Sequence, residues 1–256
     1  MQGAGDKVRG QESTGKSQGL EHLEAGPSPN SDGRDPAVAL QFIVLHYTGM
    51  LSGDEALSRL CDPSSKVSAH YLIEEDGRIF HLVDEKQRAW HAGKSFWRGI
   101  TDINSASIGI ELVNPGHQFG YRPFPLSQIA ATKALILSVM ERYHMTPTTC
   151  VLGHADIAPG RKEDPGELFP WRKLATEGIG IWPAPQESDY GYADDAEVQN
   201  LLRAIGYDCP ASGSYDQPTR AALLAFQRHY QPENLTGTPE RETVARLRAL
   251  NKKMSS

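Results

Sequence analysis

The spacing of apolar residues changes at about Trp182, and this change constrains the fold more than any other feature of the sequence. Before it, short β-rich apolar runs are mixed with helical patterns. After it, apolar residues recur at helical spacing only. The stretch 184–189 between the two parts is polar and contains proline, which is typical of a linker. We therefore expect a first domain over residues 37–183 and a helical domain over residues 190–256.

Composition limits the class of protein. The 256 residues suffice for one medium domain and one small domain. Apolar residues make up 39% and charged residues 23%, as in globular proteins, and no apolar run approaches the roughly 18 residues that span a bilayer. The net charge is -6 and the sequence shows no basic cluster, which argues against nucleic acid as a partner. We expect no transmembrane segment.

Residues 1–36 contain mainly glycine, serine and charged or amide side chains, with almost no aliphatic residues. This composition predicts a disordered arm, and it lacks the apolar core of a secretory signal. The three cysteines, Cys61, Cys150 and Cys209, form no CxxC pair and cannot all be joined within one chain. Both features favour a reducing compartment and predict a cytoplasmic location.

The first domain mixes strand and helix patterns. Apolar runs predict strands at 41–48, 107–113 and 150–154, and two strands within 69–83 flank the turn dipeptide Asp76-Gly77. Helical spacing appears at 54–60 and 126–144, and the Pro- and Gly-rich residues 155–170 read as an ordered loop. We expect an α/β fold in which a central mixed β-sheet is flanked by helices.

The second domain shows three amphipathic segments, which predict a small three-helix bundle. About 60 residues bury only a modest core, which suits a binding module better than a deep active site. The predicted helices cover residues 196–205, 217–230 and 239–250.

Two histidines and one aspartate are candidates for a metal site. His46 and His154 each lie at the end of a predicted strand, and Asp164 follows in the loop. Two neutral imidazoles and one carboxylate can hold zinc and leave a fourth position for water, as catalytic zinc sites do. On residue type alone, each of the three could equally be structural or solvated.

Five sequence strings strengthen this interpretation: VLHYT at 44–48, SAHYLI at 68–73, AWHAG at 89–93, SIGIEL at 107–112 and GHADIAPGRKEDPG at 153–166. They occur here in the order found in bacterial zinc N-acetylmuramoyl-L-alanine amidases of the AmpD and AmiD kind, relatives of phage lysozyme-type amidases and animal peptidoglycan recognition proteins. The chain resembles this family over about 37–183, and its helical domain resembles the peptidoglycan-binding domain often joined to such enzymes.

The resemblance implies roles for particular residues. His46, His154 and Asp164 would bind Zn²⁺, and Glu111 would act as the base that moves a proton from water to the leaving nitrogen. Lys162 would stabilise the oxyanion. Without the resemblance, the preferred interpretation of Glu111 is a surface glutamate on a half-buried strand, and that of Lys162 is a solvated loop lysine.

Further residues are candidates for substrate contact. The resemblance implies that His70, Trp90 and His91 line the substrate groove, and that Tyr71 lies near the metal. Arg161 could pair with carboxylates of a stem peptide. Packing within the sheet or core is the alternative for the histidines, the tyrosine and the tryptophan.

The function that the resemblance implies is zinc-dependent hydrolysis of the amide between N-acetylmuramic acid, intact or in its 1,6-anhydro form, and L-alanine. The substrate would be peptidoglycan or a muropeptide, in wall turnover or recycling. Two alternatives are a non-catalytic peptidoglycan receptor and a zinc peptidase that cuts the stem peptide. The wall-binding domain favours a periplasmic or outer-membrane-associated location if an export signal has been removed, which opposes the cytoplasmic prediction.

Overall fold

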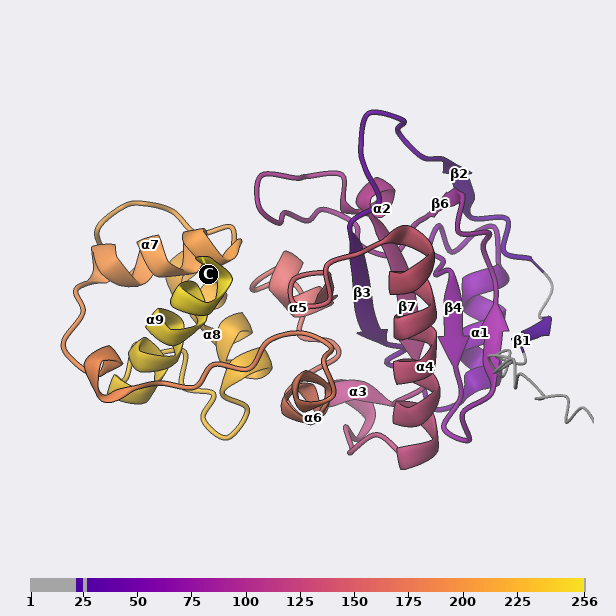
Figure 1. Cartoon of the computed structure of the whole chain (residues 1–256). Helices are drawn as coiled ribbons and strands as arrows, with labels where there is room; N and C mark the ends of the chain where they lie inside the picture. The colour runs from indigo at the N-terminus through magenta and orange to yellow at the C-terminus, as the bar shows by residue number, and fades with distance from the viewer. Residues whose placement is uncertain (1–21, 25–26, 256) are drawn as a thin grey trace, which may run out of the picture.

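The computed structural model describes residues 22–24 and 27–255. Within them, a 6-stranded mixed sheet has the strand order β1-β5-β4-β7-β3-β8, and a 2-stranded ribbon pairs β2 with β6 (Figure 1). β3 lies between β7 and β8 and is parallel to both. The strands are β1 His22–Glu24, β2 Ser31–Gly33, β3 Phe42–Tyr47, β4 Tyr71–Ile73, β5 Ile79–His81, β6 Gln87–Ala89, β7 Ser107–Leu112 and β8 Val151–Gly153.

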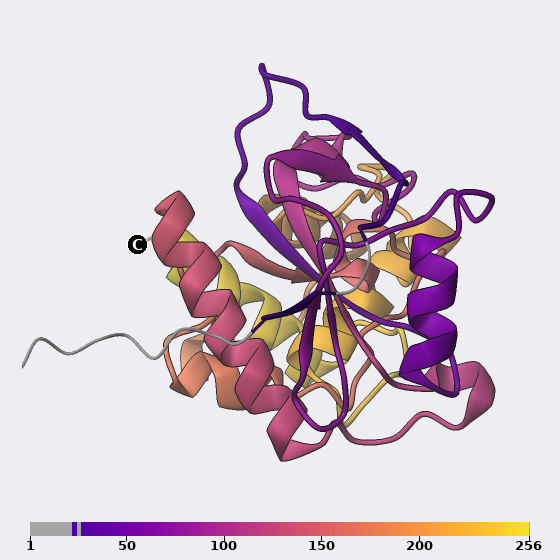
Figure 2. The same ribbon diagram turned by 90° about the vertical axis from the view of Figure 1, so that its right-hand side faces the viewer.

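Helices cover both faces of the sheet and form the second domain. α4 lies on one face of the sheet and α1 on the other (Figure 2). No helix in the part of the chain that the structure describes is both long and apolar enough to cross a membrane. The helices are α1 Gly53–Cys61, α2 Ile103–Ala106, α3 Gly116–Phe119, α4 Leu126–Tyr143, α5 His154–Ile157, α6 Trp171–Thr176, the 3-10 helix η1 Glu187–Asp189, α7 Asp195–Ile205, α8 Gln217–Tyr230 and α9 Arg241–Ser255.

The central strands separate a packing face from a functional face. Successive residues of a strand point to opposite sides. Leu45 of β3 and Ile110 of β7 share a buried cluster with Ile136 of α4. The next residues along the two strands, His46 and Glu111, are partners in the register and both line a cleft on the opposite face. The pleat of two neighbouring strands therefore brings these two polar side chains to one surface.

Local capping fixes where two of the long helices begin. The side chain of Ser52 accepts a hydrogen bond from the backbone N–H of Glu55 at 3.2 Å, so α1 starts at the following residue. Asp216 accepts from the N–H of Thr219 at 2.9 Å and starts α8 in the same way. Each cap satisfies a donor that the first turn of a helix leaves without a partner.

The predicted α/β class, with a helical domain after it, is confirmed. The strands predicted around Asp76-Gly77 are the antiparallel pair β4 and β5. The prediction of a loop over 155–170 was incomplete, because α5 occupies its start and makes His154 the first residue of a helix. The carboxylate of Asp156 accepts from the N–H of Gly153 at 2.8 Å and caps this short helix.

The prediction of disorder over 1–36 is wrong for residues 22–24, which form β1, and for residues 27–36, and residues 1–21 and 25–26 of that stretch lie outside the described part. Asn30 is buried, and its side-chain amide donates to the carbonyl oxygens of Asp62 at 2.8 Å and Val67 at 2.9 Å. Arg34 donates to the carbonyls of Ser105 at 2.8 Å and Ser107 at 3.0 Å. Side-chain bonds to backbone, which leave no apolar pattern in the sequence, hold this segment in place.

The second domain packs directly against α5 of the first domain (Figure 1). Trp97 and Ile157 of the first domain share one buried apolar cluster with Tyr207 and Phe226 of the second. The predicted linker 184–189 is also fixed, because η1 lies in it and the backbone carbonyl of Asp189 accepts from Arg248 of α9 at 2.9 Å. The two domains therefore form one continuous packed unit.

A buried polar contact, which we call the latch, joins the two domains. The latch consists of Asp156, Tyr207 and His229. The Asp156 carboxylate accepts from the Tyr207 hydroxyl at 2.7 Å and from Nδ1 of His229 at 2.7 Å. The ring of Trp171 stacks on His229 with 3.8 Å between centroids. All three latch residues are at most 5% exposed. The carboxylate is thus fully surrounded by donors and away from water.

Candidate active site

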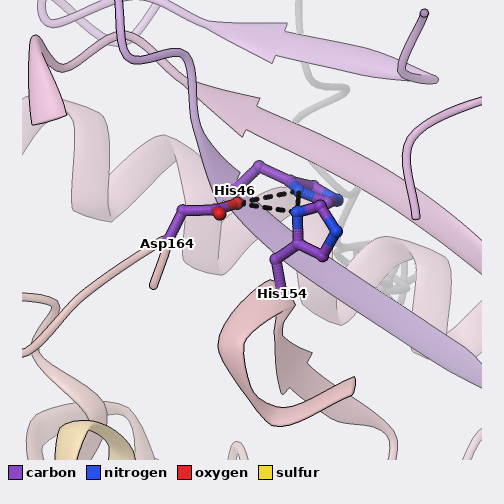
Figure 3. Close-up of side chains that lie close together, drawn as sticks. All are labelled: His46, His154 and Asp164. Carbon is purple, nitrogen blue, oxygen red and sulfur yellow. Dashed lines mark hydrogen bonds and ion pairs between the residues drawn. The ribbon is translucent and has the colours of Figure 1, made fainter. Parts of the chain in front are cut away.

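Three side chains meet near the carboxyl-terminal end of β3 (Figure 3). His46 comes from β3, His154 from the first position of α5, and Asp164 from the loop that follows. The two Nδ1 atoms are 2.9 Å apart, and each lies 3.0 Å from Oδ2 of Asp164. All three residues are buried. We call these three residues the metal cluster.

Hydrogen bonds fix the tautomer of His154. Its Nε2 lies 3.0 Å from the carbonyl oxygen of Ala92, which can only accept, so Nε2 carries the proton. Nη2 of Arg161 is 3.4 Å away but donates its two protons to the carbonyls of Ala92 at 2.7 Å and Lys94 at 2.6 Å. In the neutral imidazole, Nδ1 therefore presents a lone pair to the centre of the cluster.

A chain of three hydrogen bonds fixes the tautomer of His46. The Ser107 hydroxyl donates to the carbonyl of Ile103 at 2.5 Å, so it must accept from Nε2 of His91 at 3.3 Å. Nδ1 of His91 then accepts from Nε2 of His46 at 3.0 Å, which leaves Nδ1 of His46 unprotonated. Such support from a second layer of residues is typical of histidines that bind metals.

Charge states complete the donor set. Burial, with the nearby His154, lowers the pKa of His46 to about 4, so this imidazole is neutral at neutral pH. Burial acts to raise the pKa of Asp164, but His154 and His46 outweigh it and hold the pKa well below its ordinary value. With His154 in the tautomer that its hydrogen bond to Ala92 fixes, two imidazole nitrogens and one carboxylate oxygen face one point, which fits the ligand set of a catalytic zinc site.

Glu111 and Lys162 lie in the same cleft, a cavity of about 500 Å³. Oε2 of Glu111 is buried and has no hydrogen-bond partner among the described residues. Burial raises the pKa of Glu111 well above its ordinary value, and the negative charge of Asp164 adds to this effect. Lys162 is exposed at the rim. A carboxyl group with a raised pKa beside a metal cluster is suited to taking up and returning a proton.

Three of the five predicted substrate residues line this cleft: Trp90, His91 and Arg161. His91 is 8% exposed, and its main contact is the hydrogen bond to His46 described above. Its position therefore indicates that it orients a metal ligand. Arg161 is exposed, and its guanidinium is anchored on the carbonyls of Ala92 and Lys94.

The other two predicted substrate residues, His70 and Tyr71, are buried and are not among the residues that line the cleft, so their predicted contact with substrate is not supported. His70 is fully buried, where its Nδ1 accepts from the N–H of Gly109 at 2.9 Å. Tyr71 is buried in the cluster beneath α4, and its hydroxyl donates to Glu85 at 2.8 Å. Both side chains serve packing, which was the alternative for each.

Sequence reasoning missed the latch and one wall of the cleft. Arg59 and Leu60 of α1 line the cleft opposite the loop that carries Lys162. Asp156 belongs to the 153–166 string, but its partners Tyr207 and His229 lie in the other domain. The only available signal was the presence of a second aspartate within that string.

Two family descriptions match separate parts of the chain. Residues 35–167 match the N-acetylmuramoyl-L-alanine amidase family. Residues 192–247 match a putative peptidoglycan binding domain. Together the matches cover the α/β part with the metal cluster and the three-helix part.

Among similar proteins, N-acetylmuramoyl-L-alanine amidase AmiD of Escherichia coli is 40% identical over 234 residues, which are 84% of this chain and 83% of that protein. The 1,6-anhydro-N-acetylmuramyl-L-alanine amidase AmpD of Haemophilus influenzae is 34% identical over 163 residues, or 57% of this chain and 86% of that protein. The second match spans a length close to that of the first domain.

Two solved structures share the fold. E. coli AmiD in complex with anhydro-N-acetylmuramic acid-L-Ala-D-gamma-Glu-L-Lys superposes with a TM-score of 0.72 at 38% identity, covering 86% of this chain and 92% of that chain. AmpDh3 from Pseudomonas aeruginosa, in complex with anhydromuramic pentapeptide, gives a TM-score of 0.76 at 38% identity and covers 84% and 92%.

Proposed function

This chain belongs to the N-acetylmuramoyl-L-alanine amidase family, and we propose that it uses the metal cluster, Glu111 and Lys162 to hydrolyse the amide between N-acetylmuramic acid and L-alanine. The substrates are muropeptides, including the 1,6-anhydro form that the AmiD and AmpDh3 complexes contain. One observation carries the proposal. Three lone pairs converge in the cleft where a buried carboxylate oxygen of Glu111 has no hydrogen-bond partner within the described residues, in a chain 40% identical to E. coli AmiD.

Zinc is the metal that we propose for the cluster. His46, His154 and Asp164 would hold it with two imidazole nitrogens and one carboxylate oxygen, the donor types of a catalytic zinc site. When bound, zinc supplies a Lewis acid that polarises a carbonyl and lowers the pKa of water. The hydrogen bonds of His91 and Ala92 keep both Nδ1 atoms available for the ion.

Glu111 is the proton carrier in this mechanism. Its carboxylate takes a proton from the attacking water as the new C–O bond forms at the lactyl carbonyl. As the C–N bond breaks, Glu111 returns the proton to the leaving nitrogen of L-alanine, and the peptide departs with a free amine. The raised pKa of Glu111 suits this second role, because a weaker acid keeps the proton until the amine forms.

Lys162 stabilises the charge that develops on the carbonyl oxygen. No carboxylate pairs with its ammonium group among the described residues, and the side chain lines the cleft within the electrostatic range of His46 and Glu111. A positive charge placed before the reaction lowers the energy of an oxyanion without reorganisation. Trp90 lines the same cleft and offers an apolar face for sugar or lactyl carbons.

Mass spectrometry of the products tests the proposal. Purified protein loaded with zinc is incubated with anhydro-muropeptides, with intact muropeptides and with sacculi, each with and without a chelator. We expect free amino sugar and a peptide that begins with L-alanine, and no product after chelation. The Glu111→Gln variant is the matched control, because it keeps the three metal ligands.

The same assay separates the alternatives. A non-catalytic receptor would bind the muropeptide and release nothing. A peptidase would leave the sugar attached to a shortened peptide. Either result would overturn the proposed amidase activity, and the comparison of soluble muropeptides with sacculi reports which wall fragment the enzyme prefers.

A further inference from the structure

A second hollow adjoins the cleft and lies between the two domains. It has a volume of about 420 Å³ and is bounded on one side by residues 160–163 and on the other by α8. Arg161, Lys162 and Glu163 line both this hollow and the cleft that contains the metal cluster. The loop that carries the proposed oxyanion residue therefore also faces the second domain.

Positive charge is concentrated in this hollow. Its charged lining consists of four cations, Arg161, Lys162, Arg220 and Arg228, and one carboxylate, Glu163. The chain as a whole carries a net charge of -6, so the excess of cations is a local feature. We call this hollow the basic groove.

Among the described residues, three of the four cations have no carboxylate partner. Glu163 pairs with Arg228 at 3.1 Å. In the described ranges, no carboxylate forms an ion pair with Arg161, Lys162 or Arg220. The Nε atom of Arg228 is buried without an acceptor in the same ranges, and Arg220 donates a single 3.3 Å hydrogen bond to the carbonyl of Thr236. Since a guanidinium has five N–H donors, the groove retains unused donors suited to carboxylates.

The groove is held in place before any ligand binds. His229 follows Arg228 in α8, and it is bound to Asp156 in the latch at 2.7 Å. At the other end, a Cβ built on Gly160 would lie 3.1 Å from the side chain of Ala221, so loop and helix are in close contact. A preformed site loses less free energy in ordering when its ligand binds.

We propose that the basic groove binds carboxylates of the peptide stem beyond L-alanine, so that the helical domain forms part of the substrate site. This inference rests on the proposed function. The ligand in the AmiD complex contains L-Ala-D-gamma-Glu-L-Lys. A γ-linked glutamate keeps its α-carboxylate free, and the last residue adds a second carboxylate. Arg220 supplies a cation from α8 that the first domain alone does not possess.

Two substrates and a charge series at one position test the proposal. The substrates are anhydro-N-acetylmuramyl-L-Ala-D-γ-Glu-L-Lys and the same compound with both peptide carboxylates converted to amides. The scissile bond is identical in the two. We measure the ratio of their kcat/KM values for the native protein and for the variants Arg220→Lys, Arg220→Gln and Arg220→Glu.

We expect the native protein to prefer the carboxylate substrate through a lower KM. Arg220→Lys should keep most of this preference, Arg220→Gln should reduce it about two- to fivefold, and Arg220→Glu should reduce it further, as for an exposed ion pair. Added salt should weaken the preference of the native protein in the same direction. The control is Arg203→Glu, which makes the same change at an exposed position of α7 outside the groove.

The possible results separate the two proposals. A ratio that stays constant across the series, or falls equally in Arg203→Glu, overturns the role of the groove. Loss of the same factor on both substrates overturns it too, because the change would then be a general one. If the native protein cuts neither substrate, the proposed function itself fails.

Discussion

The metal cluster and the latch both contain buried histidine and aspartate, but they differ in whether the lone pairs of these residues receive hydrogen-bond donors. In the metal cluster, the lone pairs of His46, His154 and Asp164 face one another across about 3 Å with no proton between them in the neutral tautomers. In the latch, the Asp156 carboxylate accepts from Tyr207, from His229 and from the backbone N–H of Gly153, so both of its oxygens are hydrogen-bonded.

Residue type alone therefore does not identify a site. A buried group without a partner is costly, so a cluster of unshared lone pairs requires a cation. A carboxylate surrounded by donors requires nothing and contributes to stability. Substitutions in the two clusters should therefore have separable effects, on metal binding and chemistry in one and on stability in the other.

The largest expected effect is that of Asp164→Ala. Removal of one of three ligands should weaken zinc binding by more than the roughly 10–100-fold typical of outer-layer partners, and hydrolysis should fall to background. Zinc content by atomic absorption and turnover of anhydro-muropeptide check this. Asp208→Ala, at an exposed position, is the control. Hydrolysis at the native rate would refute the assignment of the ligand.

Glu111→Gln should have the next largest effect and should separate chemistry from metal binding. We expect kcat to fall about 10²–10⁴-fold, because the amide cannot carry the proton. Zinc content should match that of the native protein, since Glu111 is not one of the three clustered ligands. A parallel loss of zinc would mean that Glu111 is itself a metal ligand, and it would contradict the assignment of Glu111 as a base only.

Asp156→Asn tests the contribution of the latch to stability. The amide keeps the size of the side chain but lacks the charge and one of the acceptors that the latch uses, so the free energy of unfolding should fall by about 3 kcal/mol. Denaturant unfolding followed by circular dichroism measures this. The folded variant should still contain one zinc per chain. A native unfolding midpoint would show that the latch contributes little.

The smallest effect is expected for Tyr207→Phe, which removes one of the three donors to Asp156. The loss should be about 1 kcal/mol, the usual value for one hydrogen bond. Tyr192→Phe, at an 89% exposed tyrosine, is the matched control and should leave stability unchanged. Equal unfolding midpoints for the two variants would show that the Tyr207 hydroxyl does not contribute to stability.

The sequence predicted the fold class well because most of it depends on local patterns. The hairpin turn at Asp76-Gly77 and the helical spacing of α4 and α8 are visible within short windows. Residues 27–36 were predicted wrongly because Asn30 and Arg34 are held by bonds to distant carbonyls. Such bonds depend on the assembled fold and leave no periodic signal.

The candidate site was predictable only in part. His46, His154 and Asp164 were proposed through family strings, since 108 and 118 residues separate His46 from the other two. His70 and Tyr71 were proposed through the same kind of string, but both are buried and neither is among the residues that line the cleft. The latch was invisible because each half lies in a different domain.

The shared apolar cluster of Trp97, Ile157, Tyr207 and Phe226 has a consequence for protein engineering. If the helical domain were fused to a different catalytic domain, the aromatic side chains Tyr207 and Phe226 would be exposed. His229 would also lose its hydrogen-bond partner Asp156. A successful graft would have to transfer a patch of the host surface as well, including the counterpart of Asp156. The two domains and the interface between them therefore have to be transferred together.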